Sequence, residues 1–179
     1  MELKTERVTL RAWRSSDAVA LARHANNPNV ARQLRDRFPH PYTLADARQF
    51  IQAVSGARPT TLFAMVVDGE AAGGIGFFPG ADVERFSAEI GYWLAESHWG
   101  RGITVDAVRL ISTYAFDACH ILRLFALPFA DNRQSTRVLE KAGYTREAIL
   151  RSSSVKHGEV RDQALYALVN ERWALGVGS

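Results

Sequence analysis

The sequence is poor in the residues that build disulfides and metal sites. It contains one cysteine, Cys119, which excludes a disulfide within the chain and a metal site made of several cysteines. Its five histidines show neither the HExxH spacing nor another spacing typical of metal ligands. We therefore expect a function that needs no metal ion.

Long hydrophobic runs and a strong excess of one charge are also missing. No apolar stretch approaches the roughly 20 residues that a membrane-spanning helix needs, and residues 1–10 lack the apolar centre of a signal peptide. The formal net charge of +3 is compatible with an anionic ligand but is ordinary for a solvated protein surface. These observations predict a cytoplasmic protein that has no contact with a membrane and does not bind nucleic acid directly.

What the chain does contain is enough apolar sequence for one domain, predicted to span 1–179. Periodicity and turn residues divide it into strands and helices. The expected strands are 8–14, 61–70, 71–80, 85–96, 122–130, 144–156 and 160–173, and the expected helices are 18–25, 43–54, 102–118 and 132–143. The order βααβββαβαββ predicts an α/β (α+β) fold, with a mixed, mostly antiparallel sheet of about seven strands and helices on both faces.

The stretch ESHWGRGITVDA, residues 96–107, places two glycines around an arginine where a strand runs into a helix. Gly100 and Gly102 would let a ligand approach the backbone closely, and the first N–H groups of a helix favour an anion. Arg101 could add a charged contact. The alternative is that the glycines only make a tight turn. The residues alone leave both interpretations open, although no P-loop and no GxGxxG motif offers a competing phosphate site.

Two blocks resemble the GNAT superfamily of N-acetyltransferases. The first is AEIGYWLAESHWGRGITVDAVRLISTYAF, and the second is FADNRQSTRVLEKAGYTREAILR. The likeness is greatest to the subfamily that acetylates the N-termini of ribosomal proteins, and the order of strands and helices is that of the family. The resemblance implies direct transfer of an acetyl group from acetyl-CoA, as co-substrate, to a primary amine.

The resemblance also implies which residues bind the cofactor. The superfamily loop Gln/Arg-x-x-Gly-x-Gly/Ala falls on Trp99, Gly102 and Thr104, and only its central glycine matches strictly. Backbone contacts to the diphosphate are therefore expected more than side-chain contacts. The implied cofactor-binding residues are Trp93, Leu94, Trp99, Gly100, Arg101, Gly102, Ile103, Thr104, Asn132 and Ser135.

For catalysis, the resemblance implies that a backbone N–H near Leu94 faces the thioester carbonyl between two splayed strands. Leu139 stands where many relatives have a tyrosine that protonates the thiolate, and this shifts the role of general acid to Ser135. Glu89 is the candidate base, but it could equally be solvated or paired with an arginine. Glu96, Asp131 and a base acting through water are the other candidates for this role.

The acceptor is expected in a groove between residues 26–43 and the hairpin 151–162, where Asp162 orders the hairpin. Arg32, Arg35 and Arg37 suit a peptide N-terminus or an amino-acid-like substrate at least as well as a cationic amine. The expected partners are acetyl-CoA and either a peptide N-terminus or a small amine, and a homodimer is allowed. The alternatives are a small-molecule acetyltransferase and a non-catalytic module that binds acyl-CoA or associates with RNA.

Overall fold

A computed structural model describes residues 1–173, so the predicted domain end at residue 179 lies outside the described residues. The strands are β1 (Glu2–Lys4), β2 (Thr9–Ala12), β3 (Leu62–Val67), β4 (Glu70–Pro79), β5 (Ser87–Leu94), β6 (Arg123–Ala126), β7 (Thr145–Lys156) and β8 (Glu159–Val169). The helices are α1 (Ala18–Ala25), α2 (Pro28–Ala31), α3 (Leu44–Val54), α4 (Ile103–Asp117) and α5 (Arg133–Lys141). Short 3-10 turns η1 (Ser15–Asp17), η2 (Asp82–Glu84) and η3 (Glu96–His98) complete the elements.

The strands form one sheet in the order β1-β2-β3-β4-β5-β6-β8-β7, and only the β5–β6 pair is parallel. The predicted α/β fold and its mostly antiparallel sheet are confirmed. Within residues 1–173 the sheet has eight strands rather than about seven, because Glu2–Lys4 adds an edge strand too short to show alternation. The four-residue helix α2, which starts with Pro28, lies in a segment where the sequence analysis predicted no helix.

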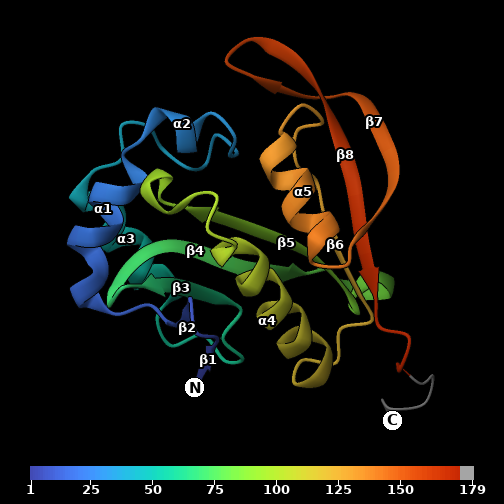
Figure 1. The fold of residues 1–179 in the computed structure, drawn as a ribbon, viewed down its shortest axis with the longest axis horizontal. Coiled ribbons are helices and arrows are strands. Elements are labelled where there is room, and N and C mark those ends of the chain that lie inside the picture. Colours follow the sequence, from blue (N-terminus) through green and yellow to red (C-terminus); the bar gives the residue numbers. More distant parts are fainter. Residues whose placement is uncertain (174–179) are drawn as a thin grey trace.

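Helices cover both faces of the sheet, as predicted. In Figure 1, α4 crosses in front of the sheet, whereas α3 lies behind it. The apolar side of α4, with Ile103, Ala107 and Ile111, belongs to the larger core cluster. Leu21 of α1 and Ile51 of α3 belong to a second cluster on the opposite face. Within residues 1–173, no helix is long and apolar enough to cross a bilayer.

Local sequence signals explain most of the connections. Asp68 and Gly69 both have positive φ angles, 51° and 86°, as the two-residue turn of a tight hairpin requires. Thr43 caps α3 and forms a capping box with Asp46. Asn132 caps α5 by accepting a hydrogen bond from the Ser135 N–H at 3.1 Å. Each of these turns and caps depends on residues only a few positions apart in the sequence.

The parallel pair β5–β6 is the part of the sheet that positions the site. The two strands pair only over Ser87–Glu89 and Arg123–Phe125. β5 continues in register with β4 as far as Leu94, whereas β6 follows β8. The two strands therefore part beyond Glu89 and leave a gap in the sheet.

Candidate active site

Backbone groups of β5 point into the gap between β5 and β6. The Ala95 N–H donates to the Ala72 carbonyl at 2.8 Å, so odd-numbered residues of β5 direct their hydrogen-bonding groups toward β4. In an antiparallel ladder the alternate residues point the other way. The N–H groups of Tyr92 and Leu94 therefore point to the side from which β6 has diverged. The Leu94 carbonyl accepts a hydrogen bond from Trp99 Nε1 at 2.8 Å, which fixes Trp99 at the edge of the gap.

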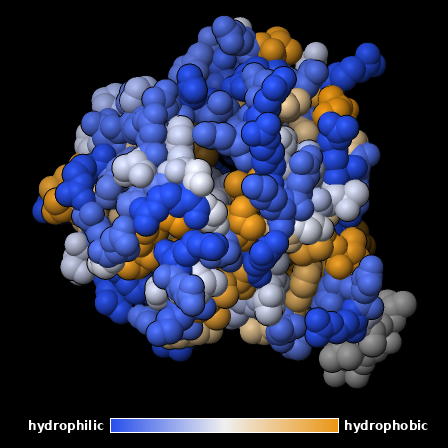
Figure 2. All heavy atoms as spheres, in the orientation of Figure 1, coloured by the Kyte–Doolittle hydropathy of each residue, from blue (hydrophilic) through white to orange (hydrophobic). Residues whose placement is uncertain are grey.

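A cavity of about 1010 Å³ fills the space around this gap. Its walls come from β5, the end of β6, the start of α4, the inner side of α5 and the segment between α2 and α3. Figure 2 shows the molecule hollowed at the centre of this face, with hydrophobic side chains inside and hydrophilic residues around them. Segments far apart in the chain thus enclose one site.

The N-terminal end of α4 opens into the cavity. Gly102 is its N-cap, with a φ angle of 76°, and no side chain caps the first turn. A Cβ on Gly100 would meet nothing within 4 Å, and a Cβ on Gly102 would meet only the Arg7 guanidinium, at 3.5 Å. The first N–H groups of a helix have no partner inside the helix, and they carry the positive end of its dipole. This corner therefore fits an anionic group such as a phosphate.

The structure brings the predicted cofactor residues together, with one exception. Of the predicted cofactor residues, those that line the cavity are Trp93, Leu94, Trp99, Gly100, Gly102, Ile103, Thr104, Asn132 and Ser135. The Arg101 side chain lies elsewhere: its Nη1 is 2.8 Å from His98 Nδ1 and 3.5 Å from an oxygen of Asp68. The predicted side-chain contact of Arg101 in this cavity therefore lacks support, because the turn directs its guanidinium toward the β3–β4 hairpin.

Ser135 of α5 lines the cavity next to Tyr92 of β5. The Tyr92 hydroxyl lies 2.8 Å from Ser135 Oγ and 3.3 Å from the Ser135 carbonyl oxygen. Burial raises the pKa of Tyr92, so its hydroxyl stays protonated and can donate to Ser135. When it donates to Ser135 Oγ, the serine hydroxyl proton is free to point toward a ligand. Leu139, which the sequence analysis placed where many relatives have a tyrosine, is fully buried in the core.

Glu89 lines the cavity and forms an ion pair with Arg35, which lies in the segment after α2. Pairing with an arginine was the alternative to its role as a base, and the ion pair exists. The pair is partly solvated, with 32% of the Glu89 side chain exposed, so the carboxylate remains accessible to a proton. The geometry therefore allows both functions for Glu89.

The other acidic candidates are held in contacts that organise the surrounding loops. Glu96 accepts hydrogen bonds from Asn27 at 2.7 Å and Asn29 at 3.0 Å, and these bonds lower its pKa. Asp131 pairs with Arg161 of β8. Asp162 accepts a hydrogen bond from the Ser152 N–H at 2.8 Å, which confirms that it orders the hairpin. Neither Glu96 nor Asp131 lines the cavity.

The two faces of β5 divide the site. Tyr92 and Leu94 turn toward α4 and α5, whereas Glu89 and Trp93 lie on the other face, because successive side chains of a strand alternate. On that second face Phe38 stacks edge-on against Trp93, with ring centroids 5.6 Å apart. A donor bound against α4 and α5 and an acceptor bound against the segment after α2 would therefore meet at the gap in the sheet.

The sequence analysis missed several lining residues, among them Tyr92, Arg137 and Lys141. Arg137 and Lys141 lie four residues apart on α5, and this spacing puts them on one side of the helix. That spacing was a usable signal for a basic edge of the site. Tyr92 shares its strand face with Leu94, but its contact with Ser135 depends on how α5 packs. Among residues 1–173, no group of three or more His, Cys, Asp or Glu side chains gathers to hold a metal ion.

The chain is similar in sequence to a known family and to proteins named as acetyltransferases. Residues 7–145 match the family described as the acetyltransferase (GNAT) domain. The chain is 29% identical to the N-acetyltransferase p20 of Bacillus licheniformis over 96% of its own length and 98% of the relative. It is 32% identical over 83 residues to the ribosomal-protein-serine acetyltransferase of Escherichia coli, which is 46% of each chain.

A solved structure has the same fold. Mycobacterium smegmatis RimJ, in complex with CoA-disulfide, superposes with a TM-score of 0.82 at 26% identity, over 96% of this chain and 87% of that one. The family match covers the strands that part, the open end of α4 and the helix that carries Ser135. The chain therefore belongs to the GNAT acetyltransferase family and is an N-acetyltransferase.

Proposed function

We propose that this chain transfers the acetyl group of acetyl-CoA to the α-amino group of a protein N-terminus, of the kind found in ribosomal proteins. One observation carries the proposal: a single cavity joins the open end of α4, the gap between β5 and β6, and the arginine-bearing segment after α2. The name of one relative, the ribosomal-protein-serine acetyltransferase of Escherichia coli, favours the same acceptor class. A cytoplasmic location belongs to this proposal, because new protein N-termini arise there.

In this proposal the start of α4 binds the diphosphate of the cofactor. The backbone N–H groups of residues 100–104 donate to the phosphate oxygens, whereas the Trp99 N–H already donates to the Glu96 carbonyl at 3.1 Å, and the glycines keep side chains out of the way. Arg137 and Lys141 add positive charge along α5. Trp93, Trp99, Leu94, Asn132 and Ser135 form the walls that guide the rest of the cofactor to the gap.

Acetyl transfer forms a bond from nitrogen to the acyl carbon and breaks the bond from that carbon to sulfur. The Leu94 N–H donates to the acyl oxygen as negative charge develops there. Ser135 gives its hydroxyl proton to the departing sulfur and regains a proton from solvent, while Tyr92 holds the serine in place. Glu89 accepts the proton of the attacking amine, directly or through a water molecule.

The charges around the acceptor face favour a peptide over a polyamine. Arg35 pairs with Glu89, and the guanidinium of Arg37 lies 4.9 Å from the centre of the Phe78 ring. A site for a polycation would need an excess of carboxylates, whereas the two carboxylates of this face, Glu89 and Asp46, are matched by two arginines, Arg35 and Arg37. A neutral peptide backbone with one terminal amine suits such a surface better.

The test is release of CoA thiol with a panel of acceptors. The panel contains amidated peptides that begin with Ala or Ser, the same peptides with blocked N-termini, free amino acids and polyamines. We expect turnover with the free peptides alone, and acetylation of their α-amino groups by mass spectrometry. Turnover with small amines alone would replace this proposal by the small-molecule alternative. A raised Tm with acetyl-CoA but no turnover with any acceptor would point to binding without transfer.

A further inference from the structure

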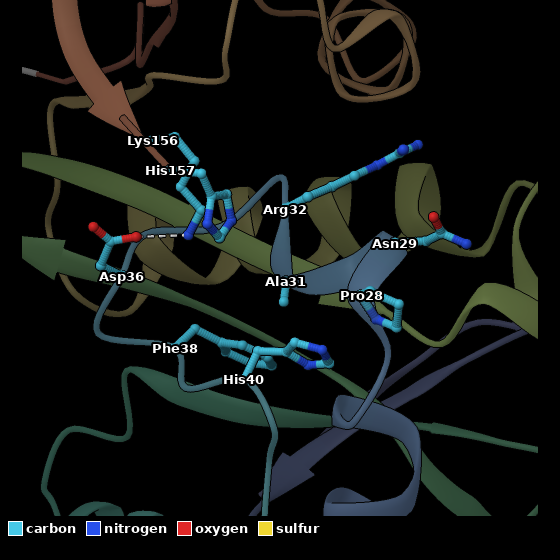
Figure 3. Close-up of a pocket in the computed structure, with 9 residues that line it drawn as sticks. All are labelled: Pro28, Asn29, Ala31, Arg32, Asp36, Phe38, His40, Lys156 and His157. Atoms are coloured by element: carbon cyan, nitrogen blue, oxygen red, sulfur yellow. Dashed lines mark hydrogen bonds and ion pairs between the residues drawn. The ribbon is translucent and has the colours of Figure 1, made fainter. Parts of the chain in front are cut away.

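A second, smaller cavity of about 410 Å³ adjoins the active-site cavity and lies outside the roles described so far. It is enclosed by α2 and the segment after it on one side and by the tip of the β7–β8 hairpin on the other. Figure 3 shows Lys156 and His157 of the hairpin above it, and Phe38 and His40 on the opposite side. We refer to it as the side cavity.

The side cavity is continuous with the acceptor face of the active site. Asn29 and Phe38 line both cavities. Phe38 stands between them, with its ring against Trp93 on the active-site side. A chain whose terminal amine reaches the gap between β5 and β6 would therefore leave the active site past Phe38 and enter the side cavity.

Positive groups predominate in the side cavity. Lys156 Nζ lies 2.7 Å from Asp36, and only 6% of the lysine side chain is exposed, compared with 76% for the aspartate. This ion pair holds the hairpin tip to the segment after α2, and it also lowers the pKa of Asp36. His40 and His157 add two imidazoles, and the cavity contains no carboxylate besides Asp36 among its described lining residues.

Arg32 supplies a positive charge that this pair does not balance. It is exposed, and no ion pair found within residues 1–173 uses its guanidinium. Glu96, which does not line the side cavity, feels the Arg32 charge as a lowering of its pKa, but its hydrogen bonds come from the neutral amides of Asn27 and Asn29, so it is no direct partner of Arg32. One unbalanced positive charge matches a single carboxylate, whereas a doubly charged phosphate would leave excess negative charge.

We infer that the side cavity binds an acidic side chain of the acceptor peptide, a few residues after the acetylated amine. This inference rests on the proposed function, because it gives the preferred sequence of the same peptide substrate. The Arg32 guanidinium attracts the carboxylate, and the Phe38 ring supports the peptide as it leaves the active site. The site thus selects among N-termini by charge.

The experiment compares pairs of amidated peptides with a free N-terminal Ala and neutral residues elsewhere. Each pair has Asp or Asn at position 2, 3, 4 or 5, so that size stays constant while charge changes. We expect kcat/KM to be about 3- to 5-fold higher for Asp at one of these positions, the range of a partly solvated ion pair. Free amino acids with an α-carboxylate should gain nothing, since the carboxylate lies too close to the amine.

Three variants test whether the side cavity causes the preference for Asp over Asn. Arg32→Gln should reduce the Asp/Asn ratio to about 1, and Asp36→Asn should raise it, because it frees the charge of Lys156. Arg48→Gln is the matched control: it removes the same charge from an exposed arginine that lines neither cavity, so the ratio should not change. Using a ratio within each variant cancels any general loss of activity.

The outcomes separate the two proposals. Equal turnover of Asp and Asn peptides at every position would overturn this inference and leave the proposed function intact. The same holds for a preference that Arg32→Gln leaves unchanged. Absence of turnover with every peptide would overturn the proposed function, and this inference with it.

Discussion

The hydroxyl of Tyr92 lies 2.8 Å from Ser135 Oγ and joins the strand at the gap to the helix beside it. The same chain contains a second pair of this kind: the Tyr144 hydroxyl lies 2.8 Å from Ser112 Oγ, away from the cavity. The two pairs have the same chemistry, but only the first one lines the site. Their comparison can therefore separate a role in the reaction from a role in folding.

Tyr92→Phe should lower kcat about 5-fold and leave the KM for acetyl-CoA nearly unchanged. The variant removes the donor that orients the Ser135 hydroxyl, and a buried hydrogen bond is worth about 1 kcal/mol. Steady-state kinetics measure this effect. Tyr144→Phe should lower the free energy of unfolding by about 1 kcal/mol, because it also loses one buried hydrogen bond, and it should leave kcat unchanged. An equal loss of kcat in both variants would assign Tyr92 a structural role.

Ser135→Ala should reduce kcat about 100-fold, the usual contribution of a positioned general acid. The variant should fold, because the Ser135 N–H still donates to the Asn132 cap and only the hydroxyl is lost. Calorimetry should then give an unchanged Kd for acetyl-CoA. Turnover at the rate of the original chain would remove Ser135 from the mechanism.

Gly102→Leu should raise the Kd for acetyl-CoA at least about 10-fold. The side chain would enter the space at the start of α4, and the φ angle of 76° also strains any residue with a Cβ, by about 1–2 kcal/mol. Gly56→Leu is the control for strain, since Gly56 has a φ angle of 81°, has open space and lines no cavity. If Gly102→Leu and Gly56→Leu had the same Kd for acetyl-CoA, the predicted phosphate site would be contradicted.

The parts of the fold that could be predicted from the sequence depend on short stretches of chain. The Asp68-Gly69 turn requires positive φ angles at adjacent residues, and the cap at Asn132 requires a side chain three residues from its donor. Such signals lie within a few residues of the structure they determine. The three-residue strand Glu2–Lys4 was missed because pairing with β2, and not its own pattern, makes it a strand.

The contacts that define the site join residues far apart in the chain. Tyr92 and Ser135 are 43 residues apart, Arg35 and Glu89 are 54 apart, and Asp36 and Lys156 are 120 apart. No local pattern determines which of several arginines reaches Glu89, because that depends on the path of the segment after α2. The sequence could therefore predict the residue types of the site but not these partners.

The Arg11–Asp17 pair should determine much of the response to acid. Two hydrogen bonds, of 2.7 and 2.9 Å, join the side chains, whose exposed fractions are only 11% and 8%. Burial alone would raise the pKa of Asp17, but the bonds from Arg11 and the Arg14 N–H outweigh it and lower the pKa below 3.8. The pair therefore stabilises the fold above pH 3.8, and this contribution disappears as the pH falls through the lowered pKa.

Asp17→Asn should accordingly lower the free energy of unfolding at neutral pH by about 3 kcal/mol, because it leaves the Arg11 charge buried without its partner. Glu2→Gln breaks an exposed pair with Arg14, of 3.4 Å, and should cost less than about 0.5 kcal/mol. Urea unfolding between pH 3 and pH 7 measures both. The original chain should lose stability more steeply than Asp17→Asn below pH 4, because the variant has no carboxylate there to protonate. Parallel pH curves for the two proteins would show that this pair does not control acid stability.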